Sequence, residues 1–130
     1  MRIIEGSLFQ DNRGLIRFIN NFDLENVRRM YLIKPELNVI RAWQGHKKES
    51  KWLYVLSGSF QVQTICMLDL NNRQNIILRS NENKVLNIKP GNYNGFLALE
   101  DSSELLVFSD KTLEDSKEDD FRLTLEDLKW

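Results

Sequence analysis

The chain has 130 residues, of which 42% are hydrophobic and 28% are charged, a length that supports one domain with a substantial core but not two. Its formal net charge of −1 excludes a general electrostatic attraction to nucleic acid or to an anionic membrane. The single cysteine, Cys66, excludes an internal disulfide, and its strand-like surroundings indicate a buried, inert thiol. No apolar run has the length of a membrane span and no signal-peptide pattern is present, so we expect a cytoplasmic protein.

Short β-strand patterns follow one another along the whole chain. They occur at residues 2–4, 14–19, 27–33, 37–43, 51–56, 59–69, 75–78, 85–88, 96–99 and 104–108. Clusters of turn-forming residues lie between many of them, at 11–14, 57–59, 71–74, 80–83 and 89–91. This spacing predicts an all-β sandwich or barrel, with residues 1–130 in a single domain.

The C-terminal part of the chain departs from this strand pattern. Residues 114–120 form a charge run that we expect to be a solvent-exposed loop. Residues 124–128 have the pattern of a short terminal helix, with Thr124 as its N-cap. The expected barrel therefore ends in a short helical or irregular tail.

Residues 39–58 combine strand formers with the polar side chains best suited to a ligand site, including the only histidine, His46. Alternation along a strand places Lys51 on one face of segment 51–56 and Tyr54 on the other. By the same count, Gln44 and His46 point the same way. Polar side chains among such apolar strands must be hydrogen-bonded or functional, because unpaired buried polar groups are unfavourable. We interpret this stretch as the floor of a ligand site.

Several segments, taken in order, resemble the cupin nucleotide-sugar isomerases. Asp11-Asn-Arg-Gly14 is similar to an Asp-x-Arg-Gly motif near the N-terminus of those enzymes. Val27-Arg-Arg-Met-Tyr31 is similar to the ketoisomerase strand that carries an active-site tyrosine. Arg41-Ala-Trp-Gln-Gly-His-Lys47 is similar to their Arg-Gly-x-His-Ala-His-Lys.

The resemblance continues in the second half of the chain. Lys51-Trp-Leu-Tyr-Val-Leu-Ser-Gly58 is similar to the epimerase Lys-Leu-Val-x-Val-x-x-Gly, and residues 120–130 resemble the epimerase tail. Ile88-Lys-Pro-Gly91 with Asn94-Gly-Phe96 resembles Ile-Pro-x-Gly followed by His-Gly-Phe. The resemblance implies a cupin barrel, a double-stranded β-helix or jelly roll. It indicates the WxcM-like group, the dTDP-4-dehydrorhamnose 3,5-epimerases and the dTDP-4-keto-6-deoxyhexose 3,4-ketoisomerases.

Two departures from these motifs affect the chemistry. Gln44 stands where both groups of enzymes place the catalytic histidine, and Asn94 stands where the second block has its histidine. Amide side chains do not titrate, so neither residue can act as a base. The histidine-base mechanism of the family therefore cannot be transferred to this chain unchanged.

The resemblance implies roles for three other side chains in proton transfer beside a keto group. His46 matches the second histidine of the ketoisomerase motif and is the candidate base. Lys51 matches the epimerase lysine and is suited to holding a developing oxyanion. Tyr31 is the candidate proton donor, with Tyr54 and Tyr93 as substitutes. The alternatives without a catalytic role are a hydrogen-bonded structural histidine for His46, a surface lysine for Lys51 and a core tyrosine for Tyr31.

Arginine and amide side chains complete the expected site. Guanidinium groups match phosphate oxygens, so Arg13 and Arg41 are candidates for binding a diphosphate. Because Arg41 and Gln44 differ in parity along a strand, a bulge near Trp43 is needed for both to face one pocket. The full set of candidate substrate-binding residues is Arg13, Arg29, Arg41, Gln44, Tyr54 and Asn94.

We expect neither a metal nor a cofactor. The positions that hold a metal in other cupins correspond here to Gln44, His46, Lys51 and Asn94, or to Glu49 in a shifted register. One imidazole beside a lysine is a poor divalent site.

The sequence leaves two functions open. The first is an isomerase acting on a nucleotide-linked, dTDP-type 4-keto-6-deoxyhexose in polysaccharide or deoxysugar biosynthesis. The second is a non-catalytic cupin that binds a nucleotide sugar or another small ligand. The resemblance also implies a homodimer that exchanges N-terminal strands.

Overall fold

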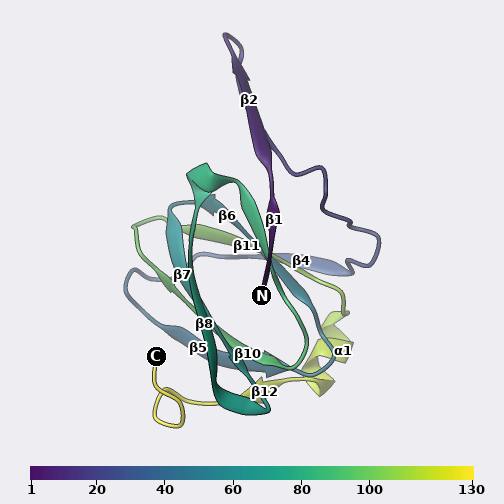
Figure 1. Cartoon of the computed structure of the whole chain (residues 1–130), viewed down its shortest axis with the longest axis vertical. Helices are drawn as coiled ribbons and strands as arrows, with labels where there is room; N and C mark the ends of the chain where they lie inside the picture. The colour runs from purple at the N-terminus through teal and green to yellow at the C-terminus, as the bar shows by residue number, and fades with distance from the viewer.

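Two antiparallel five-stranded sheets face each other and form a barrel (Figure 1). The computed structural model describes all residues, 1–130. One sheet has the order β1 (Arg2–Glu5), β9 (Lys84–Ile88), β6 (Lys51–Ser57), β11 (Glu104–Ser109), β4 (Arg29–Ile33). The other has the order β12 (Phe121–Arg122), β5 (Arg41–His46), β10 (Asn92–Ala98), β7 (Ser59–Cys66), β8 (Asp69–Arg79). The all-β prediction is confirmed.

The core lies between the two sheets because the inward-facing residues of their strands are apolar. In β6, Lys51, Leu53 and Val55 are buried, whereas the alternate residues are partly exposed, as the alternation predicted. Ten buried residues form the main cluster: Leu53, Val55, Phe60, Val62, Leu78, Leu86, Ile88, Ala98, Leu105 and Val107. The faces of β6 therefore place Lys51 at the end of an otherwise apolar row.

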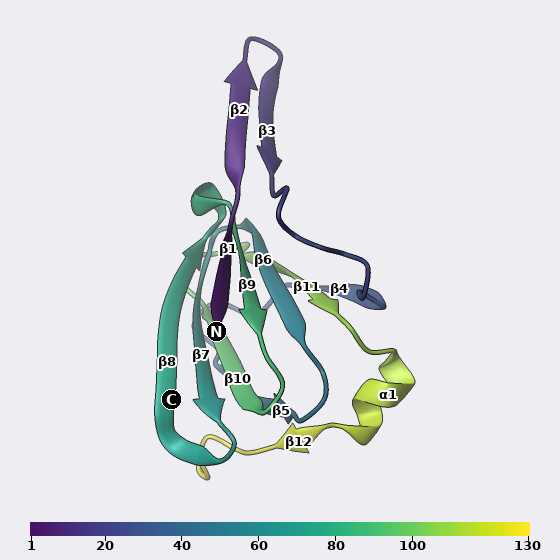
Figure 2. The ribbon, with the colours of Figure 1, turned by 45° about the vertical axis from the view of Figure 1, so that its right-hand side comes forward.

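An N-terminal hairpin projects from the barrel (Figure 2). Its strands, β2 (Ser7–Asp11) and β3 (Gly14–Phe18), pair only with each other, whereas β1 pairs with β9 of the same chain. About half of the surface of four apolar side chains is exposed on this hairpin: Leu8, Phe9, Leu15 and Ile16. The exchange of N-terminal strands between two copies would involve this hairpin, and it stays a prediction.

Most strand boundaries differ from the sequence prediction by one or more residues, and β2 was not predicted. The strand expected at 37–43 instead covers Arg41–His46. It can continue through position 45 because this residue is glycine: a Cβ atom there would overlap the Tyr93 ring, at 2.6 Å from its Cδ1 atom. The turn expected at 71–74 lies inside β8, and the hairpin turn is at residues 67–68. As β8 is an edge strand, its polar residues face water without interrupting the pairing.

The C-terminal helix lies earlier in the chain than expected. The charge run predicted as a loop contains helix α1 (Leu113–Glu118), in which Thr112 Oγ1 accepts a hydrogen bond from the Asp115 amide. At the predicted helix, Thr124 caps a single turn only. The chain leaves that turn so that Leu128 can be buried against the barrel. A 3-10 turn, η1 (Ser80–Glu82), is the only other helical element. No helix has the length and hydropathy of a membrane-spanning segment.

Candidate active site

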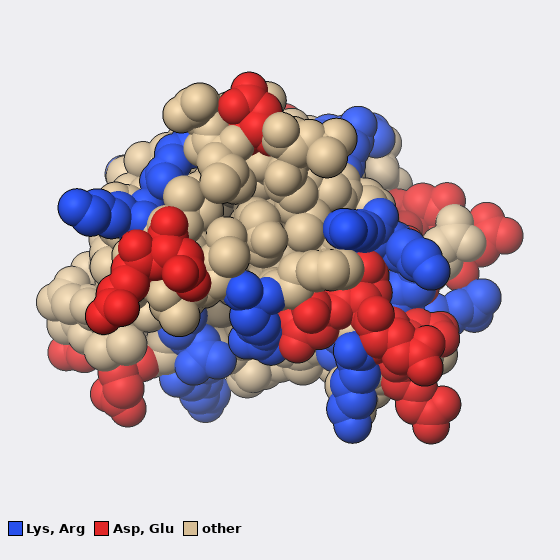
Figure 3. Space-filling model, turned by 90° about the horizontal axis from the view of Figure 1, so that it is seen from below, with Lys and Arg blue, Asp and Glu red and all other residues tan.

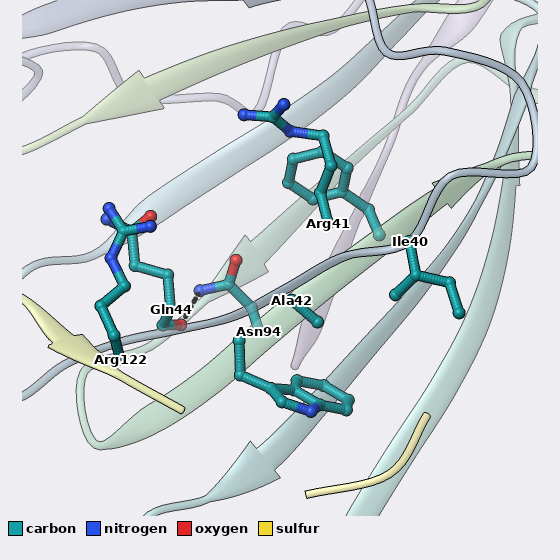
Figure 4. Close-up of a pocket in the computed structure, with 8 residues that line it drawn as sticks. Ile40, Arg41, Ala42, Gln44, Asn94 and Arg122 are labelled. Carbon is teal, nitrogen blue, oxygen red and sulfur yellow. Dashed lines mark hydrogen bonds between the residues drawn. The ribbon is translucent and has the colours of Figure 1, made fainter. Parts of the chain in front are cut away.

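Three adjoining cavities open at one end of the barrel, and we refer to them together as the pocket. All three are lined by Gln44 and Arg122. Figure 4 shows the cavity that is also lined by Ile40, Ala42, Arg41 and Asn94. The cavity that reaches the barrel core has a volume of about 210 Å³. Its lining consists of Tyr31, Ile33, Arg41, Gln44, Lys51, Leu53, Asn94, Phe96, Val107 and Arg122.

A bulge in β5 brings Arg41 and Gln44 into this pocket together. In the pairing of β5 with β10, Gln44 lies opposite Asn94 and Arg41 lies opposite Phe96, with a register shift between the two pairs. β5 therefore has one more residue than β10 over this stretch, and the extra residue reverses the parity of its side chains. This is the irregularity that the sequence required near Trp43.

Lys51 is the buried ammonium group of the pocket. It is 4% exposed, and its Nζ donates a hydrogen bond of 3.0 Å to Gln44 Oε1. Ion pairs to carboxylates are made by Lys34, Lys84 and Lys111 but not by Lys51. Burial lowers the Lys51 pKa to about 8, against the opposing charge of Glu49. Lys51 can therefore exchange a proton near neutral pH.

Tyr31 lies on β4 and lines the same two cavities as Lys51. Burial raises the Tyr31 pKa to about 12, although the nearby Arg29 guanidinium, 5.0 Å from the ring centroid, favours ionisation. The phenol therefore stays protonated at neutral pH and can donate a hydrogen bond or a proton.

His46, the predicted base, lies outside the pocket. It is 3% exposed and lines none of the three cavities. Its Nδ1 lies 2.6 Å from the Asp119 carbonyl oxygen and its Nε2 lies 2.9 Å from Glu49 Oε2. The Asp119 carboxylate accepts hydrogen bonds from the amides of residues 47–49 and folds that loop against the ring. This geometry fits the alternative of a hydrogen-bonded structural histidine.

Glu49 is the centre of the buried network that contains His46. Its carboxylate is fully buried and accepts hydrogen bonds from Arg29 at 3.1 Å, from Ser116 at 3.0 Å and from Ser109. Burial alone would raise the Glu49 pKa, but the hydrogen bonds from His46 and Ser109 and the charge of Lys51 lower it to about 2. Glu49 thus connects β4, β5, β11 and α1 behind the pocket, and Arg29 reaches the pocket rim from this network.

Two of the predicted substrate-binding residues lie away from the pocket. Arg13 is at the tip of the projecting hairpin, where it is largely exposed and pairs with Asp11 at 2.6 Å. Tyr54 is on the outer face of β6, and its hydroxyl donates to Asn83 Oδ1 at 2.9 Å. Alternation along residues 51–56 already predicted that Lys51 and Tyr54 lie on opposite faces of this strand. Tyr93, the other substitute donor, packs against a second cluster around Trp43.

Arg122 is a pocket residue that the sequence analysis missed. β12 pairs with the edge of β5 and sets Arg122 opposite Gln44. Arg122 Nε donates to Asp120 Oδ1 at 2.9 Å, and the same oxygen accepts from Gln44 Nε2 at 2.9 Å. The available signal was the similarity of residues 120–130 to the epimerase tail, which carried no information about side-chain direction.

A family model described as WxcM-like, C-terminal matches residues 1–123, nearly the whole chain. The chain belongs to this WxcM-like family. No curated protein matches it significantly. The predicted family is therefore confirmed.

Solved structures share the fold of this WxcM-like chain. QdtA, a sugar 3,4-ketoisomerase from Thermoanaerobacterium thermosaccharolyticum, is 22% identical with a TM-score of 0.76, over 94% of this chain and 87% of that one. A 3,4-ketoisomerase from Helicobacter canadensis is 22% identical with a TM-score of 0.76, over 98% and 93%. A dTDP-4-dehydrorhamnose 3,5-epimerase from Elizabethkingia anophelis is 16% identical with a TM-score of 0.79, over 97% and 76%. The predicted cupin jelly roll is confirmed.

Three of the four positions that correspond to cupin metal ligands, Gln44, Lys51 and Asn94, form a hydrogen-bonded group in this WxcM-like chain, and the fourth, His46, lies outside it. Asn94 Nδ2 donates to the Gln44 carbonyl at 2.9 Å (Figure 4), and Lys51 donates to the Gln44 side chain. An ammonium group and two amides do not form a divalent-metal ligand set. No group of three or more His, Cys, Asp or Glu side chains is arranged to hold a metal ion.

Charge is distributed unevenly around the molecule despite its near-neutral total. Seen from below (Figure 3), acidic side chains gather on the side where Figure 1 shows α1, beside basic side chains and a broad uncharged area. The pocket itself is lined by five cationic side chains, Arg29, Arg41, Lys51, Lys117 and Arg122. Asp120 is the only carboxylate in its lining, so the pocket favours an anionic ligand.

Replacing His46 with asparagine is expected to lower stability without removing proton transfer in the pocket. The smaller amide cannot span both the Asp119 carbonyl and Glu49, so we expect a loss of about 1–3 kcal/mol in the free energy of unfolding. Urea unfolding measures this loss, and isotope exchange into a keto-sugar measures the proton transfer. If the His46→Asn variant keeps its stability but loses all isotope exchange, His46 is the base.

Proposed function

We propose that the protein is an isomerase of a nucleotide-linked 4-keto-6-deoxyhexose, and that it moves protons beside the keto group by 3,4-ketoisomerisation or 3,5-epimerisation. One observation supports this most directly: Lys51, with a pKa lowered to about 8, shares a cavity with the protonated Tyr31 and with arginine side chains. Structures of similar fold include a ketoisomerase with bound TDP and a variant of it with TDP-4-keto-6-deoxyglucose.

In this proposal the base role passes from His46 to Lys51. With a pKa of about 8, about a tenth of the Lys51 side chains are neutral at pH 7. The neutral amine takes the proton from the carbon beside the keto group, and the electron pair moves into the carbonyl oxygen. The Tyr31 hydroxyl donates to this enolate oxygen. In 3,4-ketoisomerisation the Lys51 ammonium then gives its proton to C4, the former carbonyl carbon, and the amine is regenerated. The C4 oxygen keeps the Tyr31 proton as a hydroxyl, and the C3 hydroxyl returns a proton to Tyr31 as it becomes the new carbonyl. In epimerisation Tyr31 instead protonates the enolate carbon on the face opposite Lys51, and both side chains recover their protonation states by exchange with water.

The substrate-binding part of the proposal uses Arg41, Arg29, Gln44 and Asn94. Arg41 lines two of the three cavities and offers a guanidinium fork to phosphate oxygens. The amides of Gln44 and Asn94 replace titrating histidines with neutral groups that hydrogen-bond to sugar hydroxyls. We propose a homodimer in the cytoplasm as the working form, with Arg13 at the hairpin that would meet the second copy.

The second candidate is a non-catalytic nucleotide-sugar binder. The observation that favours it is the burial of the only histidine between Glu49 and the Asp119 carbonyl. Binding without proton transfer needs only the cationic pocket.

Hydrogen–deuterium exchange separates the two candidates. We expect incubation with dTDP-4-keto-6-deoxyglucose in deuterated water to label the sugar ring, as followed by NMR. Label at C4 of a 3-keto product indicates a ketoisomerase, and label at C3 and C5 of a 4-keto sugar indicates an epimerase. Calorimetric binding without any label would contradict the enzyme and support the binder.

A further inference from the structure

We propose that Arg122 binds the anionic group of the ligand together with Arg41, and that the docked C-terminal arm (residues 119–130) holds Arg122 in place. This proposal rests on the proposed function only for the identity of the anion, a nucleoside diphosphate. Figure 4 shows Arg41 and Arg122 on either side of Gln44 and Asn94, extending to the same side of β5.

The hydrogen bonding of the two arginines leaves donors free for a ligand. Arg122 uses Nε, at 2.9 Å and 3.2 Å from the two Asp120 oxygens, so both terminal nitrogens are free. Its side chain is 66% exposed, and no hydrogen bond joins Arg41 to the residues around it in Figure 4. Two guanidinium forks that face one cavity fit the adjacent charged groups of a diphosphate.

The arm holds Arg122 by two means. First, it extends the sheet: Arg122 pairs with Gln44, and Leu123 and Trp43 exchange backbone hydrogen bonds of 3.2 Å and 3.0 Å. Second, its end packs on the outside of β5. The Trp43 indole donates to the Leu128 carbonyl at 2.5 Å, and the rings of Trp43 and Trp130 lie 5.4 Å apart.

Two further contacts show how closely the end of the arm fits the barrel. Arg73 donates to the Lys129 carbonyl at 2.7 Å. A methyl group added at Gly95 would lie 2.8 Å from the Trp130 ring, so the ring packs directly on the backbone of β10. The arm also reaches the reacting centre, because Asp120 orients Gln44, which accepts from Lys51. The family model ends at residue 123, so this anchor lies beyond the matched region.

Calorimetry with dTDP and with inorganic pyrophosphate tests the binding role. We expect Arg122→Gln to weaken both ligands by about ten- to a hundredfold, as for the loss of a charge-assisted hydrogen-bonded pair. The control is Arg79→Gln, an exposed arginine paired with Glu82 outside the pocket, which should stay within about twofold. Wild-type affinity in Arg122→Gln overturns the proposal, and so does a wild-type protein that binds neither probe.

A double-mutant comparison tests the role of the arm. A chain that ends at Leu123 should lose nearly as much pyrophosphate affinity as Arg122→Gln, and the combined variant should be no weaker than Arg122→Gln alone. Trp130→Ala should cause a smaller loss of pyrophosphate affinity that is likewise not additive with Arg122→Gln. This variant replaces the shortened chain in the test if the shortened chain does not fold. Additive losses, or arm variants that bind like the wild type, overturn the proposal. Arg122-dependent binding of pyrophosphate without binding of dTDP supports it and contradicts the proposed nucleotide substrate.

Discussion

Lys51→Met is expected to lower the rate of deuterium exchange into the keto-sugar by about a hundredfold or more, the range for loss of a general base or an oxyanion donor. Methionine has a similar length and is apolar, so it fits beside Leu53 in the core-facing cavity. Because the buried ammonium has no carboxylate partner, its removal should also raise the unfolding temperature at pH 7. A loss of rate together with a gain of stability cannot come from misfolding.

The pH dependence of the same reaction gives an independent check. The Lys51 pKa is lowered to about 8, so the rate should rise with pH as the amine loses its proton and level off above about pH 8. The matched control is Lys34→Met, an exposed lysine paired with Glu104, which should leave both rate and profile unchanged. Full exchange by Lys51→Met would show that the base is a different group.

Local sequence patterns predicted the parts of the site that depend on strand geometry. Alternation along 51–56 placed Lys51 and Tyr54 on opposite faces of the strand, as they are in β6. Parity along 41–44 required a bulge if Arg41 and Gln44 were to share a pocket, and the structure contains it. These features follow from the two-residue period of a strand, which the sequence shows directly.

Contacts between distant parts of the chain could not be predicted in this way. His46 is sequestered by a carbonyl 73 residues away, and Arg122 enters the pocket because a tail segment adds to the edge of β5. Nothing in the local sequence records which edge a tail will join. The burial of His46 and the position of Arg122 in the pocket therefore both depend on long-range packing of the same C-terminal arm.

The C-terminal helix shows the limit of cap signals. Thr112 and Thr124 are both followed three residues later by an aspartate, and both hydroxyls accept from that aspartate's amide. Only the first cap begins a helix, in which Ser116 is buried and donates to Glu49. Burial of Leu128 and Trp130 against the Trp43 cluster takes precedence over the second helix.

Glu49→Gln is expected to destabilise the protein by about 3–5 kcal/mol at pH 7, the range for removing one partner of a buried ion pair. The change leaves Arg29 and His46 without their shared carboxylate, and it leaves α1 without one of its contacts to the barrel. Urea unfolding measures the loss. The control is Glu104→Gln, a partly exposed glutamate paired with the exposed Lys34, which should change stability by less than about 1 kcal/mol.

The ionisation of Glu49 determines whether the stability of the protein rises or falls with pH. The Glu49 pKa falls from 4.5 to about 2 on folding, so its ionised form stabilises the fold fully above about pH 4.5. That contribution, about 3 kcal/mol, is lost as the pH falls from 4.5 toward 2. The stability difference between the wild type and Glu49→Gln should therefore shrink over this interval. A difference that stays constant down to pH 2 would mean that Glu49 acts through its shape rather than through its charge.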